Sequence, residues 1–136
     1  PNGPDLTQIV EDLELDNGEV LFSRDKIDEQ KVATLYNVAD VTVNISDAEG
    51  FGLSCLESLA CETPVLFSDT GRMRDFVHIG KTGMISEETN AESFSMNIRE
   101  FLKNEKTFIF REHYYEKISK FEWTLIFKKL TSQLIK

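Results

Sequence analysis

Apolar positions in the first ninety residues switch repeatedly between helical and strand spacing. Leu6, Ile9, Val10 and Leu13 recur at intervals of three and four residues, which is the spacing of an amphipathic helix. Short runs rich in apolar or β-branched residues separate such helical stripes and predict strands. The predicted helical stripes lie at 6–13, 32–39, 53–60 and 72–77, and the predicted strands lie at 19–23, 41–45, 64–68 and 84–86.

Residues with special backbone preferences stand at the ends of these elements. Pro4 fits the first turn of the first helix, and Asn17-Gly18 fits its end. Asp28 is a helix-capping residue that precedes the second helical stripe. Pro64 opens the third strand, at a position where proline is tolerated.

Beyond residue 90 the spacing is helical only, and three stripes predict three helices. Helices alternating with strands and followed by helices are typical of a parallel sheet covered by helices. We therefore predict an α/β fold with a Rossmann-like parallel sheet, helices on both faces and a helical carboxy-terminal tail. The three stripes are Phe94, Ile98, Phe101 and Leu102; Phe108, Tyr114, Tyr115 and Ile118; and Trp123, Ile126, Phe127, Leu130 and Leu134.

The composition fits one globular domain. Of the 136 residues, 40% are hydrophobic and 29% are charged, which is too apolar for a disordered chain. The formal net charge of −9 argues against a nucleic-acid binder that relies on phosphate contacts. Residues 99–136 are mildly basic, with nine Lys and Arg against five Asp and Glu. Lys128 and Lys129 there fit either a solvated helix face or a contact with an anionic membrane surface.

Cysteine and histidine are too few for a disulfide scaffold or a metal centre. Cys55 and Cys61 lie six residues apart and would point in different directions on one helix, so free thiols and a reducing compartment are predicted. His78 and His113 make no metal-ligand spacing with them. The chain has no apolar run near the ~20 residues of a membrane span and no signal-peptide pattern. We expect a cytoplasmic protein or one at the cytosolic membrane face.

The most informative stretch is 46–57, which reads SDAEGFGLSCLE. It begins where the second predicted strand ends, and ligands of open α/β sheets bind beyond the carboxyl ends of strands. Gly50 and Gly52 allow positive φ angles and a close approach of a ligand to the backbone. The first free N–H groups of the following helix suit a phosphate, because a helix N-terminus carries partial positive charge.

Two carboxylates flank this expected anion site. Glu49 lies in the loop, and Glu57 lies on the second helical turn, where side chains lean back toward the helix N-terminus. Carboxylates accept hydrogen bonds and can hold the paired hydroxyls of a ribose or a hexose. A phosphate site beside two such groups indicates a nucleotide-sugar. From the residues alone, a tight turn followed by a solvated helix face explains the same pattern.

The order of these motifs resembles the carboxy-terminal, donor-binding domain of the retaining GT-B glycosyltransferases of family 4. Seven residues separate Glu49 from Glu57, which is the family's E-x7-E spacing. The resemblance covers nearly the whole chain. The matching residues are Ala39, Asp40, Val41, Ser46, Glu49, Gly50, Phe51, Gly52, Leu53, Glu57, Ala60, Thr63, Pro64 and Val65, with glycine turns at 70–71 and 80–83.

The resemblance implies a role for each of these site residues. Glu57 would bind the ribose hydroxyls of a nucleotide, and Glu49 would act as the catalytic residue at the donor sugar. The loop backbone would hold the sugar or the diphosphate, and the end of the first predicted strand would lie near the base. The reaction implied is retaining transfer of a hexose from a UDP-, GDP- or ADP-sugar to a sugar, lipid-linked sugar or protein hydroxyl, without metal or cofactor. The implied substrate-binding set is Glu49, Gly50, Phe51, Gly52, Leu53, Glu57, Ser23 and Arg24.

The same resemblance implies an incomplete domain. Residues 1–90 would form the nucleotide-sugar-binding part, and residues 91–136 would form helices that pack on it. The family's acceptor domain, its diphosphate-gripping basic loop and its two central strands have no counterpart in this chain. We therefore expect the chain alone to be inactive, and its sheet to be completed by an upstream segment, by a second copy or by rearrangement. The alternatives are a non-catalytic nucleotide-sugar-binding or regulatory module, and an interaction domain without a ligand.

Three residues depart from the family pattern. Glu62 stands where glycine is usual, and a bulky residue there disfavours positive φ. Arg72 stands where a second glycine is usual, and Asp75 where glutamate is usual. Arg72 fits either a charge directed at the phosphate or an exposed surface arginine.

Overall fold

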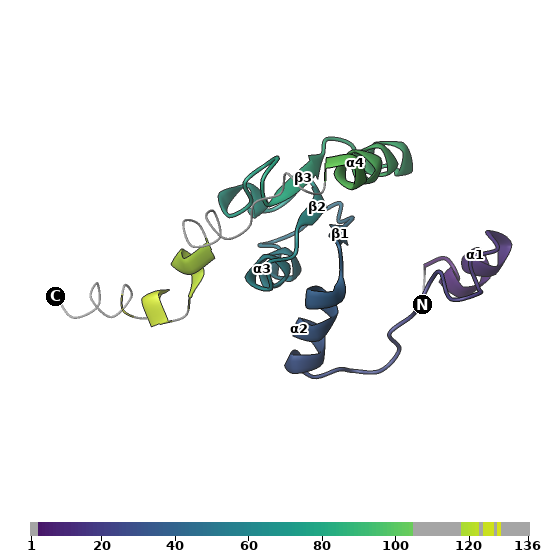
Figure 1. Ribbon diagram of the computed structural model, residues 1–136, viewed down its shortest axis with the longest axis horizontal. Helices are drawn as coiled ribbons and strands as arrows, with labels where there is room; N and C mark the ends of the chain where they lie inside the picture. The colour runs from purple at the N-terminus through teal and green to yellow at the C-terminus, as the bar shows by residue number, and fades with distance from the viewer. Residues whose placement is uncertain (1–2, 105–117, 123, 127, 129–136) are drawn as a thin grey trace.

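The computed structural model describes residues 3–104, 118–122, 124–126 and 128. Figure 1 shows a small sheet flanked by helices, with the first helix at the end of an extended linker. The elements follow in the order α1 (Leu6–Asp12), α2 (Glu29–Val38), β1 (Thr42–Asn44), α3 (Leu53–Ala60), β2 (Val65–Ser68), the 3-10 helix η1 (Met73–Asp75), β3 (Gly83–Ser86), α4 (Ala91–Asn104) and the 3-10 helix η3 (Ile118–Phe121).

The sheet is parallel and its strand order is β1-β2-β3. Val65 of the central strand pairs with Thr42 on one side and with Gly83 on the other. All four residues of β2 are buried, which is typical of a strand covered on both faces. Helix α3 packs on β1 and β2, and α4 packs on β2 and β3. The predicted α/β architecture around a parallel sheet is therefore confirmed.

The hydrophobic core lies between β2, α3 and the segment that follows β2. Phe67, Met73 and Phe76 are at most 1% exposed, and their burial is a main source of stability. Gly83 allows β3 to lie close to β2, because a Cβ at this position would stand 2.6 Å from the carbonyl oxygen of Val65. The other buried members of this cluster are Cys55, Leu59, Val65, Val77 and Ile118.

The predicted first residues are confirmed for helix α2 but not for helix α1. Asp28 caps α2 as predicted, because its carboxylate accepts a hydrogen bond of 2.8 Å from the backbone N–H of Lys31. In α1 the cap is Asp5, which accepts from the N–H of Thr7, so Pro4 lies before the helix and not in its first turn. A carboxylate satisfies the unpaired N–H groups of a first turn, which proline cannot do. Helix α1 also ends earlier than the Asn-Gly pair.

The predicted strand at 19–23 is wrong, since this segment has irregular structure between α1 and α2. A strand needs a partner for its backbone groups, and no described strand lies beside this segment. Leu21 is 86% exposed and Phe22 is 42% exposed. The apolar run that predicted a strand is therefore left uncovered by the described part of the chain.

Strand β1 forms one edge of the sheet that the described residues build, with β2 as its single neighbour. Val43 and Ile45 are 39% and 63% exposed, although their run reads as an interior strand. Helix α2, which leads into β1, exposes Leu35 and Val38 at 53% and 74%. The described part of the chain therefore leaves this apolar surface uncovered.

Helix α3 ends at a strained residue. The N–H of Glu62 bonds the carbonyl of Leu59 at 3.0 Å, and the N–H of Thr63 bonds that of Ser58 at 3.0 Å. This pair of bonds closes a helix when the residue after its last turn adopts a left-handed conformation, for which glycine is preferred. Glu62 adopts it nonetheless, with φ of 61°. The departure from the family's glycine has therefore left the backbone geometry in place.

Glu62→Gly is expected to raise the free energy of unfolding by about 1 kcal/mol, because glycine removes the left-handed strain at this position. Urea denaturation of the two proteins would measure the change. Glu87→Gly is the matched control, since Glu87 lies in an exposed loop without positive φ. A Glu62→Gly protein no more stable than Glu87→Gly would contradict the prediction.

The predicted carboxy-terminal helices fall largely outside the described residues. Ile118 is buried at 7% exposure and belongs to the 3-10 helix η3, and the residues predicted to form a helix before it lie outside the description. Within the described ranges, no helix combines the length and hydrophobicity needed to cross a membrane. The predicted helix residues that lie outside the description are Phe108, Tyr114, Tyr115, Trp123, Phe127, Leu130 and Leu134.

Candidate functional site

The loop at 46–52 is fastened at its start to the end of β2. Ser68 is fully buried, and its hydroxyl donates to the carbonyl oxygen of Ser46 at 2.6 Å. The same hydroxyl accepts a hydrogen bond of 3.1 Å from the N–H of Ser46. The carboxyl ends of β1 and β2 are thus held together, where open α/β sheets present their ligand-binding loops.

Two glycines allow this loop to lie directly against the segment after β2. Gly52 caps α3 with φ of 91°, and a Cβ there would stand 2.7 Å from Cγ of Met73. Gly71 has φ of 63°, and a Cβ there would stand 2.6 Å from the carbonyl oxygen of Glu49. Gly50 does not adopt positive φ, and no other atom lies within 4 Å of where its Cβ would stand, so the backbone there is open to the approach that the prediction requires. The left-handed turn is needed only where the helix begins.

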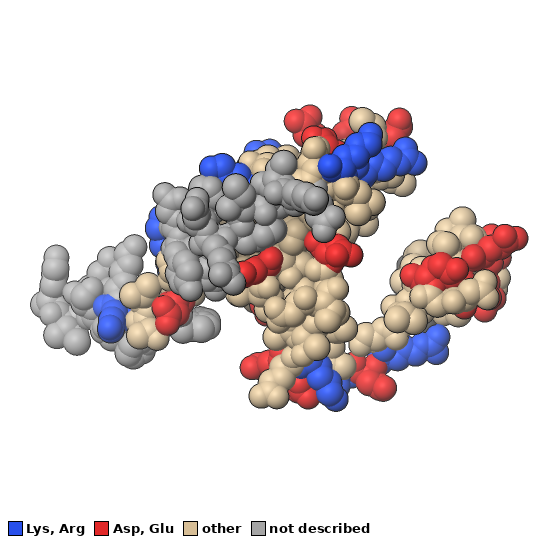
Figure 2. Space-filling model, viewed as in Figure 1, with Lys and Arg blue, Asp and Glu red and all other residues tan. Residues whose placement is uncertain are grey.

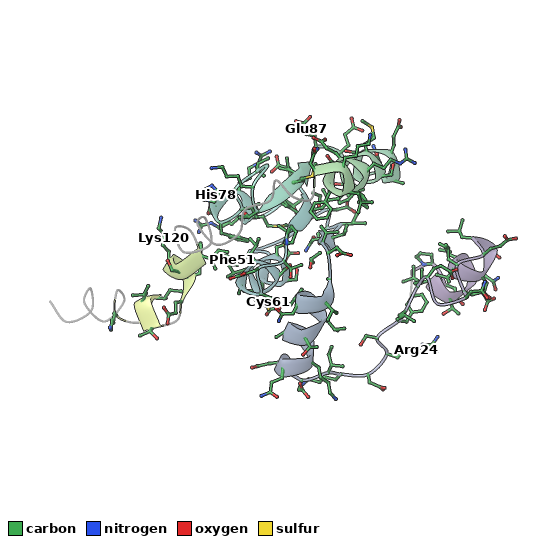
Figure 3. The ribbon with its side chains drawn as sticks, in the orientation of Figure 1. Arg24, Phe51, Cys61, His78, Glu87 and Lys120 are labelled. Carbon is green, nitrogen blue, oxygen red and sulfur yellow. The ribbon has the colours of Figure 1, made fainter. Side chains whose placement is uncertain are left out.

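The ring of Phe51 holds the loop to the core. Its centroid lies 5.5 Å from that of Phe76 and 5.4 Å from that of Phe121, and the last two rings are 5.7 Å apart. Stacked and edge-to-face pairs of this kind each contribute about 0.5–1.5 kcal/mol beyond their burial. Figure 3 shows Phe51 on the side of the molecule toward η3. The side chain is thus committed to packing, and the backbone of the loop remains for other contacts.

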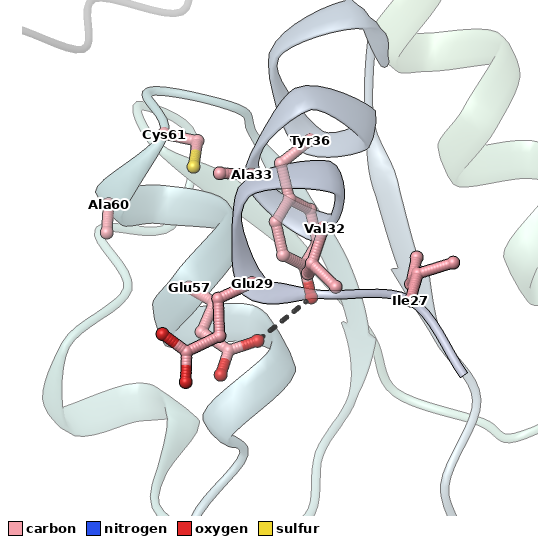
Figure 4. A pocket seen from close by; sticks show the side chains of 8 residues that line it. All are labelled: Ile27, Glu29, Val32, Ala33, Tyr36, Glu57, Ala60 and Cys61. Carbon is pink, nitrogen blue, oxygen red and sulfur yellow. Dashed lines mark hydrogen bonds between the residues drawn. The ribbon is translucent and has the colours of Figure 1, made fainter.

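Glu57 and Tyr36 meet between α3 and α2. The Tyr36 hydroxyl donates a hydrogen bond of 3.3 Å to Oε2 of Glu57 (Figure 4). Burial, the charge of Glu57 and this hydrogen bond raise the pKa of Tyr36 to about 12, so the phenol keeps its proton at neutral pH. The second carboxylate oxygen of Glu57, which is an exposed residue, remains available as an acceptor.

A pocket of about 370 Å³ lies between α2 and α3, beside this hydrogen bond. Its volume is within the range of small-molecule sites, roughly 300–1,000 Å³. Figure 4 shows Glu29 and Glu57 at the same side of the pocket in this view, with the Cys61 thiol further along the helices. An apolar surface with acceptors at one side suits a ring that carries hydroxyls. The described lining residues are Ile27, Glu29, Val32, Ala33, Tyr36, Glu57, Ala60 and Cys61.

The predicted site residues lie in three places. Glu57 lines the pocket, and the half-buried Glu49 lies in the loop before α3, next to Gly71. Ser23 and Arg24 lie on the exposed linker, where the Ser23 hydroxyl donates a weak 3.4 Å bond to the carbonyl of Asp25. Figure 3 shows Arg24 well away from Phe51 and from the pocket residue Cys61. The structure therefore does not bring Ser23 and Arg24 to the other predicted residues.

Tyr36 and Glu29 are pocket residues that the sequence prediction missed. Tyr36 belongs to the apolar stripe of its helix, so its spacing indicates a core residue. The hydroxyl of Tyr36 could have indicated a polar contact, because a buried tyrosine usually directs this group to a hydrogen-bond partner. Glu29 stands in the first turn of α2, where an acidic residue is explained by the helix dipole alone.

The basic side chains that follow β2 are held by neighbouring carboxylates. Arg72 Nε lies 2.7 Å from Asp75 Oδ2, and Arg74 forms two bonds, of 2.6 and 2.7 Å, with Asp69. These bonds lower the pKa of Asp69. Of the two interpretations of Arg72, the structure favours an exposed surface arginine.

The acidic side chains of helix α1 lie on a different part of the surface from these arginines, as Figure 2 shows.

The two thiols of the site region are both free. Burial raises the pKa of Cys55 to about 11, and burial followed by the charge of Glu57 raises that of Cys61. Neither environment favours a reactive thiolate at neutral pH. Among the described residues, no group of three His, Cys, Asp or Glu side chains is arranged to hold a metal ion.

Comparison with known proteins identifies the family of the chain. The sequence pattern of the family described as "Glycosyl transferases group 1" matches residues 4–121, which is most of the chain. The chain belongs to the group 1 glycosyltransferases. The resemblance that the E-x7-E motif carries is thereby confirmed at the level of the family.

Two bacterial relatives show how much of a group 1 glycosyltransferase the chain contains. A D-inositol 3-phosphate glycosyltransferase of Thermobispora bispora is 32% identical over 103 residues, covering 74% of this chain and 24% of the relative. An N-acetyl-alpha-D-glucosaminyl L-malate synthase of Bacillus anthracis is 25% identical over 108 residues, covering 77% of this chain and 27% of the relative. The chain spans about a quarter of the length of these curated relatives.

A solved structure confirms the fold assignment. Sucrose-phosphate synthase from Thermosynechococcus elongatus is 27% identical and superimposes with a TM-score of 0.79. The match covers 95% of this chain and 33% of that protein. The described α/β unit is therefore part of a GT-B fold, as the sequence pattern predicts.

Proposed function

We propose that this chain is the donor-binding part of a retaining glycosyltransferase that transfers a hexose from a nucleotide-sugar to a hydroxyl acceptor. Membership of the group 1 glycosyltransferases supports the reaction class. The observation that carries the proposal is the position of Glu57, whose carboxylate stands beside a pocket between α2 and α3. Its free oxygen can accept hydrogen bonds from the two ribose hydroxyls of a nucleotide.

The loop before α3 is the proposed site for the diphosphate and the donor sugar. The residue that caps α3 is Gly52, which has no side chain to bond the N–H groups of the first turn. These groups therefore remain available to an anion. We assign the backbone N–H groups of Phe51, Gly52 and Leu53 to the phosphate or sugar. Glu49 is assigned to the donor sugar near the reacting centre, and the packing of Gly71 on its backbone supports a fixed position for it.

We propose that the intact enzyme includes further elements, among them an acceptor domain, because the chain spans about a quarter of the length of its relatives. We propose that the exposed edge of β1, with Val43 and Ile45, is covered by additional strands of the same domain or by a second copy of the chain. The chain alone is proposed to bind the donor without transferring the sugar. The acceptor is a hydroxyl of a sugar, a lipid-linked sugar or a protein.

Calorimetric titration with UDP, GDP and ADP tests this proposal. One of the three is expected to bind, and Glu57→Ala is expected to weaken it at least tenfold, about 1.4 kcal/mol, because the ribose loses its acceptor. Glu100→Ala, an exposed substitution on α4, is the matched control and should leave the affinity unchanged.

The result that would overturn the proposal is binding that Glu57→Ala and Glu100→Ala affect equally. Failure of all three nucleotides to bind would argue against a self-sufficient donor site in this chain. Alkylation of the pocket thiol Cys61, with and without nucleotide, gives a second readout, because a ligand in the pocket should slow its labelling.

A further inference from the structure

We propose that Tyr36 is a positioning residue, which orients the Glu57 carboxylate so that its second oxygen faces the ribose of the donor. This inference rests on the proposed function of Glu57. It starts from the contact between the two side chains, in which the Tyr36 hydroxyl donates to Oε2 at 3.3 Å. Occupying Oε2 from the α2 side leaves Oε1 as the acceptor toward a ligand (Figure 4).

The backbone of Tyr36 is itself held in place. Thr63, which is 4% exposed, donates its hydroxyl to the Tyr36 carbonyl oxygen at 2.6 Å. Thr63 lies in the turn after α3, and its N–H closes that helix by bonding the Ser58 carbonyl. The hydroxyl of Tyr36 therefore bonds the helix that carries Glu57, and its carbonyl bonds the turn that ends this helix. A carboxylate that accepts a hydrogen bond from a side chain held in this way has a more fixed orientation than one surrounded only by water.

The protonation state of the phenol suits this role. Burial, the charge of Glu57 and the hydrogen bond raise the pKa of Tyr36 to about 12. The hydroxyl therefore remains a donor through the physiological pH range. A neutral donor also leaves the negative charge of the carboxylate intact, so Glu57 can still accept hydrogen bonds from two ligand hydroxyls.

A double-mutant cycle distinguishes positioning from direct contact. Tyr36→Phe keeps the ring and removes the donor, and it is expected to weaken the binding of UDP, GDP or ADP, whichever binds, about fivefold. In a Glu57→Ala background the same substitution should have no further effect, because a residue that acts through the Glu57 carboxylate has nothing left to position. Val32→Ala, which alters the same pocket without removing a hydrogen-bonding group, is the control and should weaken binding equally in both backgrounds.

A second readout needs no nucleotide. The 13Cζ resonance of Tyr36, assigned by its loss in Tyr36→Phe, should titrate at a lower pH in Glu57→Gln than in the wild-type chain. An unchanged titration, or a Tyr36→Phe effect of the same size in both backgrounds, would overturn the role of Tyr36 while leaving the proposed function standing. Failure of every nucleotide to bind the wild-type chain would overturn the proposed function and the inference together.

Discussion

Gly71→Ala is expected to lower the free energy of unfolding by roughly 2–4 kcal/mol. Two separate costs add at this position. Gly71 has φ of 63°, which an alanine adopts only with strain of about 1–2 kcal/mol. The new Cβ would also stand 2.6 Å from the carbonyl oxygen of Glu49, and a backbone atom cannot move aside as the end of a side chain can.

Gly80→Ala separates these two costs. Gly80 has φ of 78°, similar to Gly71, but no atom lies within 4 Å of the position of its Cβ. This control should therefore show only the strain, about 1 kcal/mol. Urea denaturation of both variants measures the difference. Equal destabilisation by the two substitutions would show that the loop of Glu49 does not pack on Gly71 as the structure has it.

The strands that the sequence predicts correctly are those whose partners lie among the described residues. The run at 64–68 becomes the central strand β2, because β1, β3 and α3 are all present to cover it. Asp28 caps its helix because capping depends on the nearest three residues alone. The run at 19–23 has the same apolar character, yet it finds no strand beside it and stays irregular. The spacing of apolar residues shows which side chains a segment can bury, but a strand forms only where neighbouring strands and helices are present to cover it.

The residues of the candidate site also fall into those that the sequence could predict and those that it could not. The glycine loop and Glu57 could be predicted, since strand, turn and helix follow one another along the chain. Tyr36 could not, because its contact with Glu57 depends on how α2 packs against α3 across 21 positions of sequence. Ser23 and Arg24 belong to the strand that did not form. Their assignment to the base depends on a strand pairing that the described residues do not provide.

Part of the uncovered apolar surface lies on the β1 side of the sheet. The side of the sheet near β3 is closed by α4, whose Phe94 and Phe101 are at most 4% exposed. At the other side, Ile45 and Val38 remain 63% and 74% exposed. An apolar strand edge of this kind invites pairing with further strands. The β1 side of the described sheet is therefore where the proposed additional strands or second copy would pair.

Phe76→Ala is expected to destabilise the chain by about 3–5 kcal/mol, which is the range for removing a buried aromatic ring. Phe76 is 1% exposed and joins the ring of Phe51 in the loop to that of Phe121 in η3. Its removal leaves a cavity between three segments that are distant in the sequence. Denaturation in urea measures the loss, and the fluorescence of Trp123 and far-ultraviolet circular dichroism follow the transition independently.

Phe22→Ala is the control for loss of a phenylalanine as such, because Phe22 is 42% exposed on the linker. It should cost less than about 1 kcal/mol, as surface substitutions generally do. A cycle of Phe51→Leu and Phe76→Leu then tests whether the two rings act together, with a coupling of about 0.5–1.5 kcal/mol expected for the stacked pair. Additive losses would mean that Phe51 is fixed by its backbone alone. In that case the glycine contacts, and not the aromatic rings, hold the loop against the core.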